Sequence, residues 1–287
     1  MQTMRVLVVG CGDVGQRLLR LVPPGVQMLV LAREPERLAA WRASGVRLLR
    51  GDLDDPASLR RLAGLADAVV HLAPPPGQGE GDPRTAALLA ALARGRAPRA
   101  FVYVSTTGVY GDWGGARIDE TAVRRAQTAR ALRRVDAEER LRVWARERSV
   151  RLSLLRAPGI YAADREGHPR ERLLAGRPLL RAEDDVFTNH IQADDLARAC
   201  WRALFLGKPL RAVNVVDDSE RRMGEHFDLA AARLGLPRAP RISRAEASVQ
   251  MTPMQLSFLS ESRRIGNQRL KRELRLRLRY PLPELGW

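Results

Sequence analysis

The sequence contains little cysteine, little lysine and no long apolar segment. Its two cysteines, Cys11 and Cys200, are too few for the disulfide framework of a small secreted domain. The histidines lack metal-ligand spacing, so we expect no metal site. No apolar run approaches the roughly 18 residues that a membrane helix requires, and the first residues lead directly into a short, strand-like run. We therefore expect a cytoplasmic protein without a signal peptide or a membrane partner.

Positive charge comes almost entirely from arginine, because Lys208 and Lys271 are the only lysines in a chain with a formal net charge of +16. A basic surface can attract nucleic acid, and residues 263–279 are the best candidate segment for such binding. That segment lacks interleaved aromatic residues, and the arginines are spread along the whole chain, often close to Glu or Asp. The composition therefore disfavours a nucleic-acid partner.

Short apolar runs alternate with helical stretches through the first half of the chain, which is typical of repeated βαβ units. Runs such as VLVV, MLVLA and FVYVS are apolar on both faces, as strands of a parallel sheet covered by helices must be. The pattern therefore predicts an α/β fold with a Rossmann-type doubly wound parallel sheet. Strands are predicted at 5–9, 28–32, 46–50, 68–72 and 100–104, and helices at 14–21, 35–43, 56–64 and 85–94.

The second half of the chain is less regular. A loop is predicted at 111–121, a long helix at 128–146, and strands at 150–155 and 213–216. We assign residues 1–156 to an NAD(P)-binding Rossmann domain, to which residues 186–216 return. Residues 157–185 and 217–287 are assigned to a smaller C-terminal substrate-binding part.

A glycine-rich turn follows the first predicted strand. In VVGCGDVGQRLL, Gly10 permits the tight turn, Gly12 lets the backbone approach a pyrophosphate, and Gly15 lets the helix pack closely on the strand. Asp13 and Val14 lie in the first turn of the helix, whose free N–H groups favour phosphate. Glycine loops also cap helices for structural reasons, but the strand before this loop and the helix after it favour dinucleotide binding.

The end of the second predicted strand distinguishes NAD from NADP. An acidic residue there would bind the ribose 2′-hydroxyl of NAD, but this chain has Arg33, which can pair with a 2′-phosphate. The alternative is that Arg33 is simply a solvated residue at the start of a helix. Because Glu34 follows immediately, NADP is the predicted cofactor and NAD stays possible.

Two further turns are expected beside the cofactor. Asp52 and Leu53 follow the third strand, where a carboxylate can accept a hydrogen bond from the adenine amino group. The alternative for Asp52 is capping of the helix predicted at 56–64. Leu72 and Ala73 end the fourth strand, where the chain passes beside the nicotinamide ribose.

Several ordered motifs resemble the short-chain dehydrogenase/reductase superfamily, in its extended and atypical branch of NAD-dependent epimerases and dehydratases. The resemblance covers the chain almost from end to end. It implies a nicotinamide cofactor, a small-molecule substrate such as a sugar nucleotide or another hydroxylated metabolite, and a homodimer contact on the helix at 128–146. The matching segments are GCGDVG, GDLDD, YVSTTGVYGD, AEE at 137–139, LRAPGIY, NHIQADDLARA and NVVDD.

The same resemblance assigns catalytic positions, two of which depart from the family. Thr106 matches the hydroxyl residue that polarises a substrate oxygen, although it could instead satisfy backbone groups at a strand end. Arg130 and Arg134 stand where the family has its catalytic tyrosine and lysine. Arginine cannot exchange protons near neutral pH, so these residues could bind ribose hydroxyls or anions, or could point into solvent.

Other residues are candidates for the missing acid–base group. Tyr161 is the preferred surrogate, with Tyr110 and His190 as alternatives, because all three are expected to lie near the cleft at the C-terminal ends of strands. The sequence therefore supports two functions: an oxidoreductase, epimerase or dehydratase with a non-standard active site, or a catalytically silent NADP(H)-binding sensor or regulator.

Overall fold

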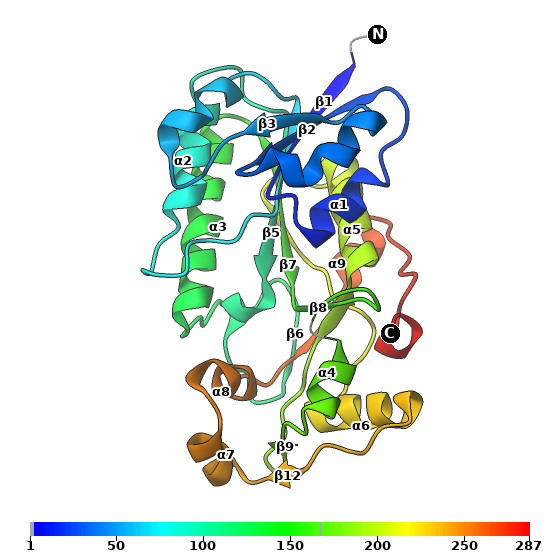
Figure 1. Ribbon diagram of the computed structural model, residues 1–287. Coiled ribbons are helices and arrows are strands. Elements are labelled where there is room, and N and C mark those ends of the chain that lie inside the picture. Colours follow the sequence, from blue (N-terminus) through cyan, green and yellow to red (C-terminus); the bar gives the residue numbers. More distant parts are fainter. Residues whose placement is uncertain (1–2, 167) are drawn as a thin grey trace.

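The computed structural model describes residues 3–166 and 168–287, so residues 1–2 and 167 of the two predicted domains lie outside the described residues. Its centre is a seven-stranded, entirely parallel sheet in the order β11-β7-β5-β4-β1-β2-β3 (Figure 1). The chain builds outward from β1 to β3, then crosses back to β4 and continues outward to β11. The predicted fold class is confirmed. The strands are β1 (Met4–Val9), β2 (Val26–Ala32), β3 (Arg47–Arg50), β4 (Ala68–His71), β5 (Ala100–Thr106), β7 (Arg151–Ala157) and β11 (Arg211–Asn214).

Helices cover both faces of this sheet, as its apolar strands require. Along β1, Val6 and Val8 pack into one core cluster and Leu7 and Val9 into the other, because side chains of a strand alternate between faces. The first cluster lies under α1 (Asp13–Leu19) and α5 (Ala193–Leu206), and the second under α2 (Pro83–Leu92) and α3 (Ala129–Glu147) (Figure 1).

Two of the predicted helices are 3₁₀ segments, η1 (Pro35–Ser44) and η2 (Pro56–Leu62). Each of them buries a pair of residues against the rest of the protein. Pro35 and Leu38 are buried in η1, and Leu59 and Leu62 in η2, so each pair is three residues apart. That spacing brings both side chains onto one face when the helix has three residues per turn.

The remaining elements gather mainly beyond the C-terminal edge of the sheet, where α4, α6, α7 and α8 lie in Figure 1. The loop predicted at 111–121 contains a short strand, β6 (Arg117–Ile118), which pairs with β13 (Arg264–Ile265). In the described part of the chain, no helix is both long enough and apolar enough to cross a membrane. The other elements are β8 (Gly159–Tyr161), β9 (Leu179–Leu180), β10 (His190–Gln192), β12 (Arg241–Ile242), α4 (Pro169–Leu174), α6 (Met223–Leu234), α7 (Arg244–Gln250), α8 (Pro253–Leu259), α9 (Gln268–Arg272), η3 (Thr107–Tyr110) and η4 (Pro283–Leu285).

A buried ion pair joins α3 to the centre of the sheet. The carboxylate of Glu138, which is fully buried, accepts hydrogen bonds from Arg156 at 2.7 and 3.0 Å and from the Ser105 hydroxyl at 2.7 Å. The guanidinium of Arg156 also lies over the ring of Tyr110, with its carbon 4.8 Å from the ring centroid. The Tyr110 hydroxyl in turn donates to Asn214 on β11 at 2.6 Å. One polar network therefore connects α3, β5, β7 and β11.

The substitution Glu138→Gln should lower the free energy of unfolding by about 3–5 kcal/mol, because it leaves the buried guanidinium of Arg156 without its counter-ion. Urea denaturation measures this loss. The control is Glu139→Gln, whose side chain is 58% exposed and pairs with Arg124 at the surface; it should change stability by less than about 1 kcal/mol. Equal losses for the two variants would show that the buried pair does not stabilise the fold.

Candidate functional site

The three glycines of the turn after β1 have different structural roles. Gly10 has a φ of +86°, and a Cβ there would lie 2.5 Å from the backbone nitrogen of Ala73. A Cβ on Gly15 would lie 3.2 Å from the Cys11 sulfur. A Cβ added to Gly12, the N-cap residue of α1, would meet no atom within 4 Å. The turn is therefore tight at Gly10 and Gly15, and open at Gly12, where a phosphate could meet the free N–H groups of the helix.

A cavity of about 450 Å³ lies beside this turn. The structure brings six of the predicted cofactor residues together in its lining. Sequence reasoning missed Arg37 and Arg84, which also line it and which had only the generic signal of exposed arginines. Asp13, Val14, Gly15, Leu72 and Arg134 are not in the lining. The six predicted residues are Gly10, Gly12, Arg33, Asp52, Leu53 and Ala73.

The arginines of this cavity differ in whether they are already paired. Arg37 forms an ion pair with Glu34 at 2.7 Å, and Arg84 donates to Asp54 at 2.7 Å. Arg33 is exposed at the end of β2, and in the described part of the chain no hydrogen bond or ion pair engages its guanidinium. Glu34 is thus occupied by Arg37, and Arg33 is available to a ligand.

Hydrogen bonds hold the residues in the turns that follow β3 and β4. Asp55, and not Asp52, caps η2, because its side chain accepts from the backbone N–H of residue 57 at 3.1 Å. Asp52 accepts from the backbone of Asp54 at 3.0 Å and lines the cavity. The backbone N–H groups of Leu72 and Ala73 both donate to the carbonyl of residue 9, at 2.8 and 3.0 Å. These bonds hold the end of β4 against the glycine turn.

Asp13 and Val14 lie in the first turn of α1, where their backbone N–H groups could bind a phosphate. The carboxylate of Asp13 is turned toward two arginines, Arg17 at 3.0 Å and Arg165 at 2.6 Å. Arg165 lies in the loop between β8 and α4. The negative charge of Asp13 at this helix terminus is therefore neutralised by its own partners.

A second cavity, of about 310 Å³, opens at the end of β5. Thr106 lines it, and its side-chain oxygen accepts from the backbone of Gly108 at 3.1 Å. Thr106 therefore caps η3, which is the structural role that the sequence allowed. Its hydroxyl hydrogen can still be donated, and its role toward a substrate stays a prediction. Arg130 and His190 also line this cavity.

Arg130 and Arg134 occupy distinct environments. The guanidinium carbon of Arg130 lies 4.5 Å from the ring centroid of Phe258, at the wall of the second cavity. Arg134 turns toward the sheet, where it donates to the Tyr103 hydroxyl at 2.9 Å and to the carbonyl of residue 104 at 2.8 Å. Arg134 is thus a fixed cation at the end of β5, not a solvent-directed side chain.

The tyrosines considered as acid–base surrogates do not line this cavity. Tyr110 is fully buried and is held by Asn214, so the expectation that it faces the cleft is wrong. Tyr161 is 6% exposed, and the C-terminal segment packs on its ring: a Cβ added to Gly286 would lie 3.1 Å from a carbon of that ring. Burial and nearby carboxylates raise the pKa of the Tyr161 hydroxyl further above its usual value. These features disfavour proton transfer by Tyr161.

His190 is held in a stack of two histidine rings. Its centroid lies 4.0 Å from that of His226, with 18° between the rings. Burial lowers the pKa of His190 well below its usual value and lowers the pKa of His226 to about 4. Both rings are therefore uncharged near neutral pH, and His190 offers the cavity a neutral polar surface.

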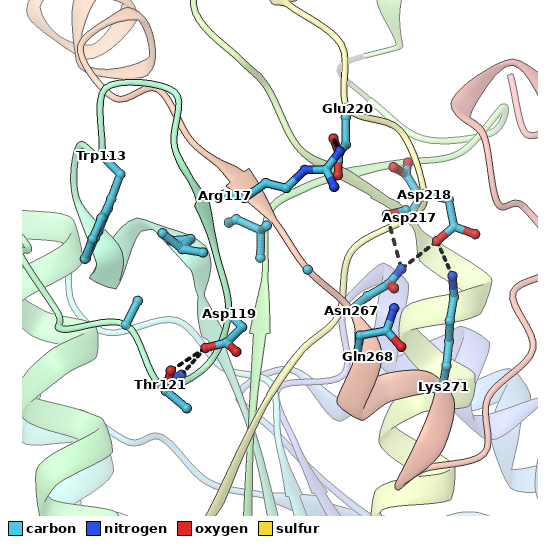
Figure 2. A pocket seen from close by; sticks show the side chains of 14 residues that line it. Trp113, Arg117, Asp119, Thr121, Asp217, Asp218, Glu220, Asn267, Gln268 and Lys271 are labelled. Atoms are coloured by element: carbon cyan, nitrogen blue, oxygen red, sulfur yellow. Dashed lines mark hydrogen bonds and ion pairs between the residues drawn. The ribbon is translucent and has the colours of Figure 1, made fainter.

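A larger cavity, of about 670 Å³, lies elsewhere, beside β6, β13 and α9 (Figure 2). Two of its acidic groups are engaged: Asp218 by Lys271 at 2.5 Å and by Asn267 at 2.8 Å, and Glu220 by Arg117. The buried Oδ2 of Asp217 has no hydrogen-bond partner among the described residues, and burial raises the pKa of Asp217 to about 7. None of the described residues that are predicted to bind the cofactor lines this cavity. Among the described residues, no group of three His, Cys, Asp or Glu side chains could hold a metal ion.

Comparison with known proteins agrees with this geometry. A family model described as NAD(P)H-binding matches residues 10–205. A functionally unknown conserved protein from Silicibacter pomeroyi is 30% identical, with a TM-score of 0.81 over 99% of this chain and 96% of that one. UDP-glucose 4-epimerase from Thermotoga maritima is 18% identical, with a TM-score of 0.79 over 99% and 96%. The dTDP-glucose 4,6-dehydratase of Streptomyces venezuelae, solved with NAD, is 20% identical, with a TM-score of 0.78 over 98% and 94%. A search of curated proteins gives no match.

Substitutions at Gly12 and Gly10 should separate ligand binding from folding. Gly12→Asp keeps a good N-cap residue and meets no atom, so stability should change by less than about 1 kcal/mol. Its carboxylate would occupy the open phosphate position and should abolish dinucleotide binding. Gly10→Ala should instead cost about 2 kcal/mol or more, because the residue has a positive φ and the new Cβ meets the backbone. Thermal denaturation and NADPH titration of both variants check this, and a stable Gly12→Asp variant that still binds NADPH would contradict it.

Proposed function

Because the chain belongs to the NAD(P)H-binding family of the short-chain dehydrogenase/reductase superfamily, we propose that it binds NADP(H) and acts on a small hydroxyl- or carbonyl-bearing metabolite. The observation that carries the cofactor assignment is the unpaired guanidinium of Arg33 in the cavity beside the glycine turn. The reaction class is hydride transfer, alone as in an oxidoreductase or within an epimerase or dehydratase cycle.

The residues of the first cavity suit the adenosine end of the dinucleotide. The open backbone at Gly12 would receive the pyrophosphate, and Arg33 would pair with the 2′-phosphate. Asp52 and Leu53 would bound the adenine. Glu34, the residue that would compete for a ribose hydroxyl, is paired with Arg37 in the same cavity.

The nicotinamide end would lie where β4 and β5 end. Leu72 and Ala73 would pass beside its ribose, and Arg134 takes the place of the family lysine as a cation anchored to Tyr103. Arg134 could therefore donate to ribose hydroxyls without moving far from the sheet. It cannot lower the pKa of a tyrosine at position 130, because residue 130 is itself an arginine.

The second cavity would hold the substrate. When bound, the nicotinamide ring accepts or supplies a hydride. The Thr106 hydroxyl would donate to the substrate oxygen, and the positive charge of Arg130 would stabilise negative charge that develops there. Because arginine keeps its proton at all working pH values, the proton that accompanies hydride transfer would be exchanged with water.

We propose that residues 157–185 and 217–287 share the substrate contacts with the Rossmann part, to which Arg130 and His190 of the lining also belong. The second cavity is lined from the first of these segments by Pro158 and Gly159, and from the other by Met223 and Phe258. The Rossmann part, residues 1–156, contributes the floor of this cavity through Thr106.

The alternative function is a catalytically silent NADP(H)-binding sensor. It is favoured by one observation: neither Tyr110 nor Tyr161 lines the second cavity. The resemblance also implies that Arg130 stands at the position of the family tyrosine. In that case cofactor binding would be retained and hydride transfer would be absent.

The substitution Arg33→Ala should weaken NADPH binding by about 10- to 100-fold, the effect of losing a charge-assisted hydrogen bond, and should leave NADH binding unchanged. Fluorescence titration of each cofactor measures both affinities. The matched control is Arg47→Ala, which removes an exposed arginine of neighbouring β3 that does not line the cavity. Equal losses for NADPH and NADH in the Arg33 variant would overturn the 2′-phosphate assignment.

Transfer of deuterium from NADPH labelled at C4 distinguishes the enzyme from the sensor. Incubation with a metabolite pool should give a deuterated product that mass spectrometry identifies. Thr106→Val should reduce this transfer by about 10-fold or more while NADPH binding persists, because the donor to the substrate oxygen is lost. Binding of NADPH with no deuterium transfer to any metabolite would support the sensor.

A further inference from the structure

The cavity beside Thr106 carries an excess of positive charge. Two guanidinium groups line it, those of Arg130 and Arg263, against one carboxylate, Glu261. Glu261 pairs with Arg263 at 2.7 Å. In the described part of the chain, no carboxylate pairs with Arg130. The histidine of the cavity, His190, is uncharged because burial lowers its pKa. The lining is therefore complementary to one negative charge.

Arg263 has an unsatisfied donor although it is nearly inaccessible. It is 7% exposed, and one terminal nitrogen donates both to the carbonyl of Gly111 and to Glu261, each at 2.7 Å. Its Nε–H group is buried and has no acceptor within the described residues. Buried donors of charged groups almost always have a partner. Because Arg263 lines the cavity, a ligand acceptor that displaces the contacts over this group can provide the missing partner.

Arg130 is placed to provide the second contact. Its planar group lies over the ring of Phe258, 4.5 Å from the centroid. Stacking on an aromatic ring covers the face of a guanidinium and leaves its N–H edges free to donate, which suits the planar, two-oxygen geometry of a carboxylate. Arg130 and Arg263 are 133 positions apart in the sequence and line the same cavity.

The size of the cavity favours a small ligand. Its volume of about 310 Å³ accommodates roughly ten non-hydrogen atoms, if each takes the ~30 Å³ that a water molecule occupies in the liquid. A nucleotide sugar is several times larger. A phosphate dianion would exceed the single positive charge that is left beside Glu261.

We infer that this cavity binds a small metabolite with one carboxylate, held between Arg130 and Arg263, whose carbonyl or hydroxyl group reaches Thr106. The inference names the substrate class of the proposed hydride-transfer site and rests on that function for the role of Thr106. Arg130, at the position of the family tyrosine, is then a substrate-binding residue and sets specificity for acids.

Calorimetric titration of the NADPH-loaded protein with oxamate, an unreactive analogue of a 2-oxo acid, tests the inference. Oxamate should bind, and Arg130→Gln should weaken its binding by about tenfold or more, as expected for loss of a charge-assisted hydrogen bond. Arg263→Lys keeps the charge but removes the Nε–H donor, and should also weaken binding. The charge-matched control is Arg125→Gln, which removes an exposed arginine stacked on Trp113 outside the cavity and should have no effect.

Each outcome decides a different point. Absence of oxamate binding to protein that does bind NADPH would overturn the anion site and leave the cofactor assignment intact. Equal effects of Arg125→Gln and Arg130→Gln would reduce the binding to general surface charge and overturn it as well. Tighter binding of inorganic phosphate, with the same dependence on Arg130, would overturn the choice of a carboxylate. If NADPH itself does not bind, the proposed function fails, and titration of the cofactor-free protein with oxamate still decides the anion site.

Discussion

Glu138 is a buried carboxylate that must be paired with a positive charge, and this requirement sets the geometry of the candidate site. A charge removed from water must be neutralised and hydrogen-bonded, and Glu138 meets this need through Arg156 and Ser105 at the ends of two central strands. Arg134 and Arg130 precede Glu138 by one and two helical turns, so the three share a helix face. Fixing Glu138 against the sheet therefore directs Arg134 to the end of β5 and Arg130 to the cavity beyond it.

The sequence predicted the sheet and the glycine turn well because both depend on local pattern. Apolar β-branched runs determine which segments are buried strands, and Gly10 and Gly12 lie where a strand meets a helix. The type of helix at 35–44 and 56–62 was missed, because apolar residues three positions apart share a face in an α-helix and in a 3₁₀ helix alike. Local pattern also could not show that Tyr110 is tied to Asn214, 104 positions later, or that the C-terminal segment packs on Tyr161.

The resemblance implies that Arg130 and Arg134 replace a tyrosine–lysine pair, and such a replacement would change what the scaffold can offer. A tyrosine beside a lysine moves protons, whereas two guanidinium groups supply permanent positive charge. In this chain one of the arginines is fixed to the strand end through Tyr103 and the other faces the ligand cavity. The chain shares its fold with the Thermotoga maritima epimerase, and the site that we propose on this fold would differ in its electrostatics from a proton-transfer site.

Because the chain has only two lysines, reagents that modify amines have few sites of attachment. Lys208 pairs loosely with Glu273 and is 60% exposed, whereas Lys271 is tied to Asp218 and is 38% exposed. Neither lines the cavity at the glycine turn or the one at Thr106. Apart from the α-amino group, amine-directed dyes and surface linkers would therefore attach beside α9 alone. Attachment through these lysines leaves both cavities chemically unmodified.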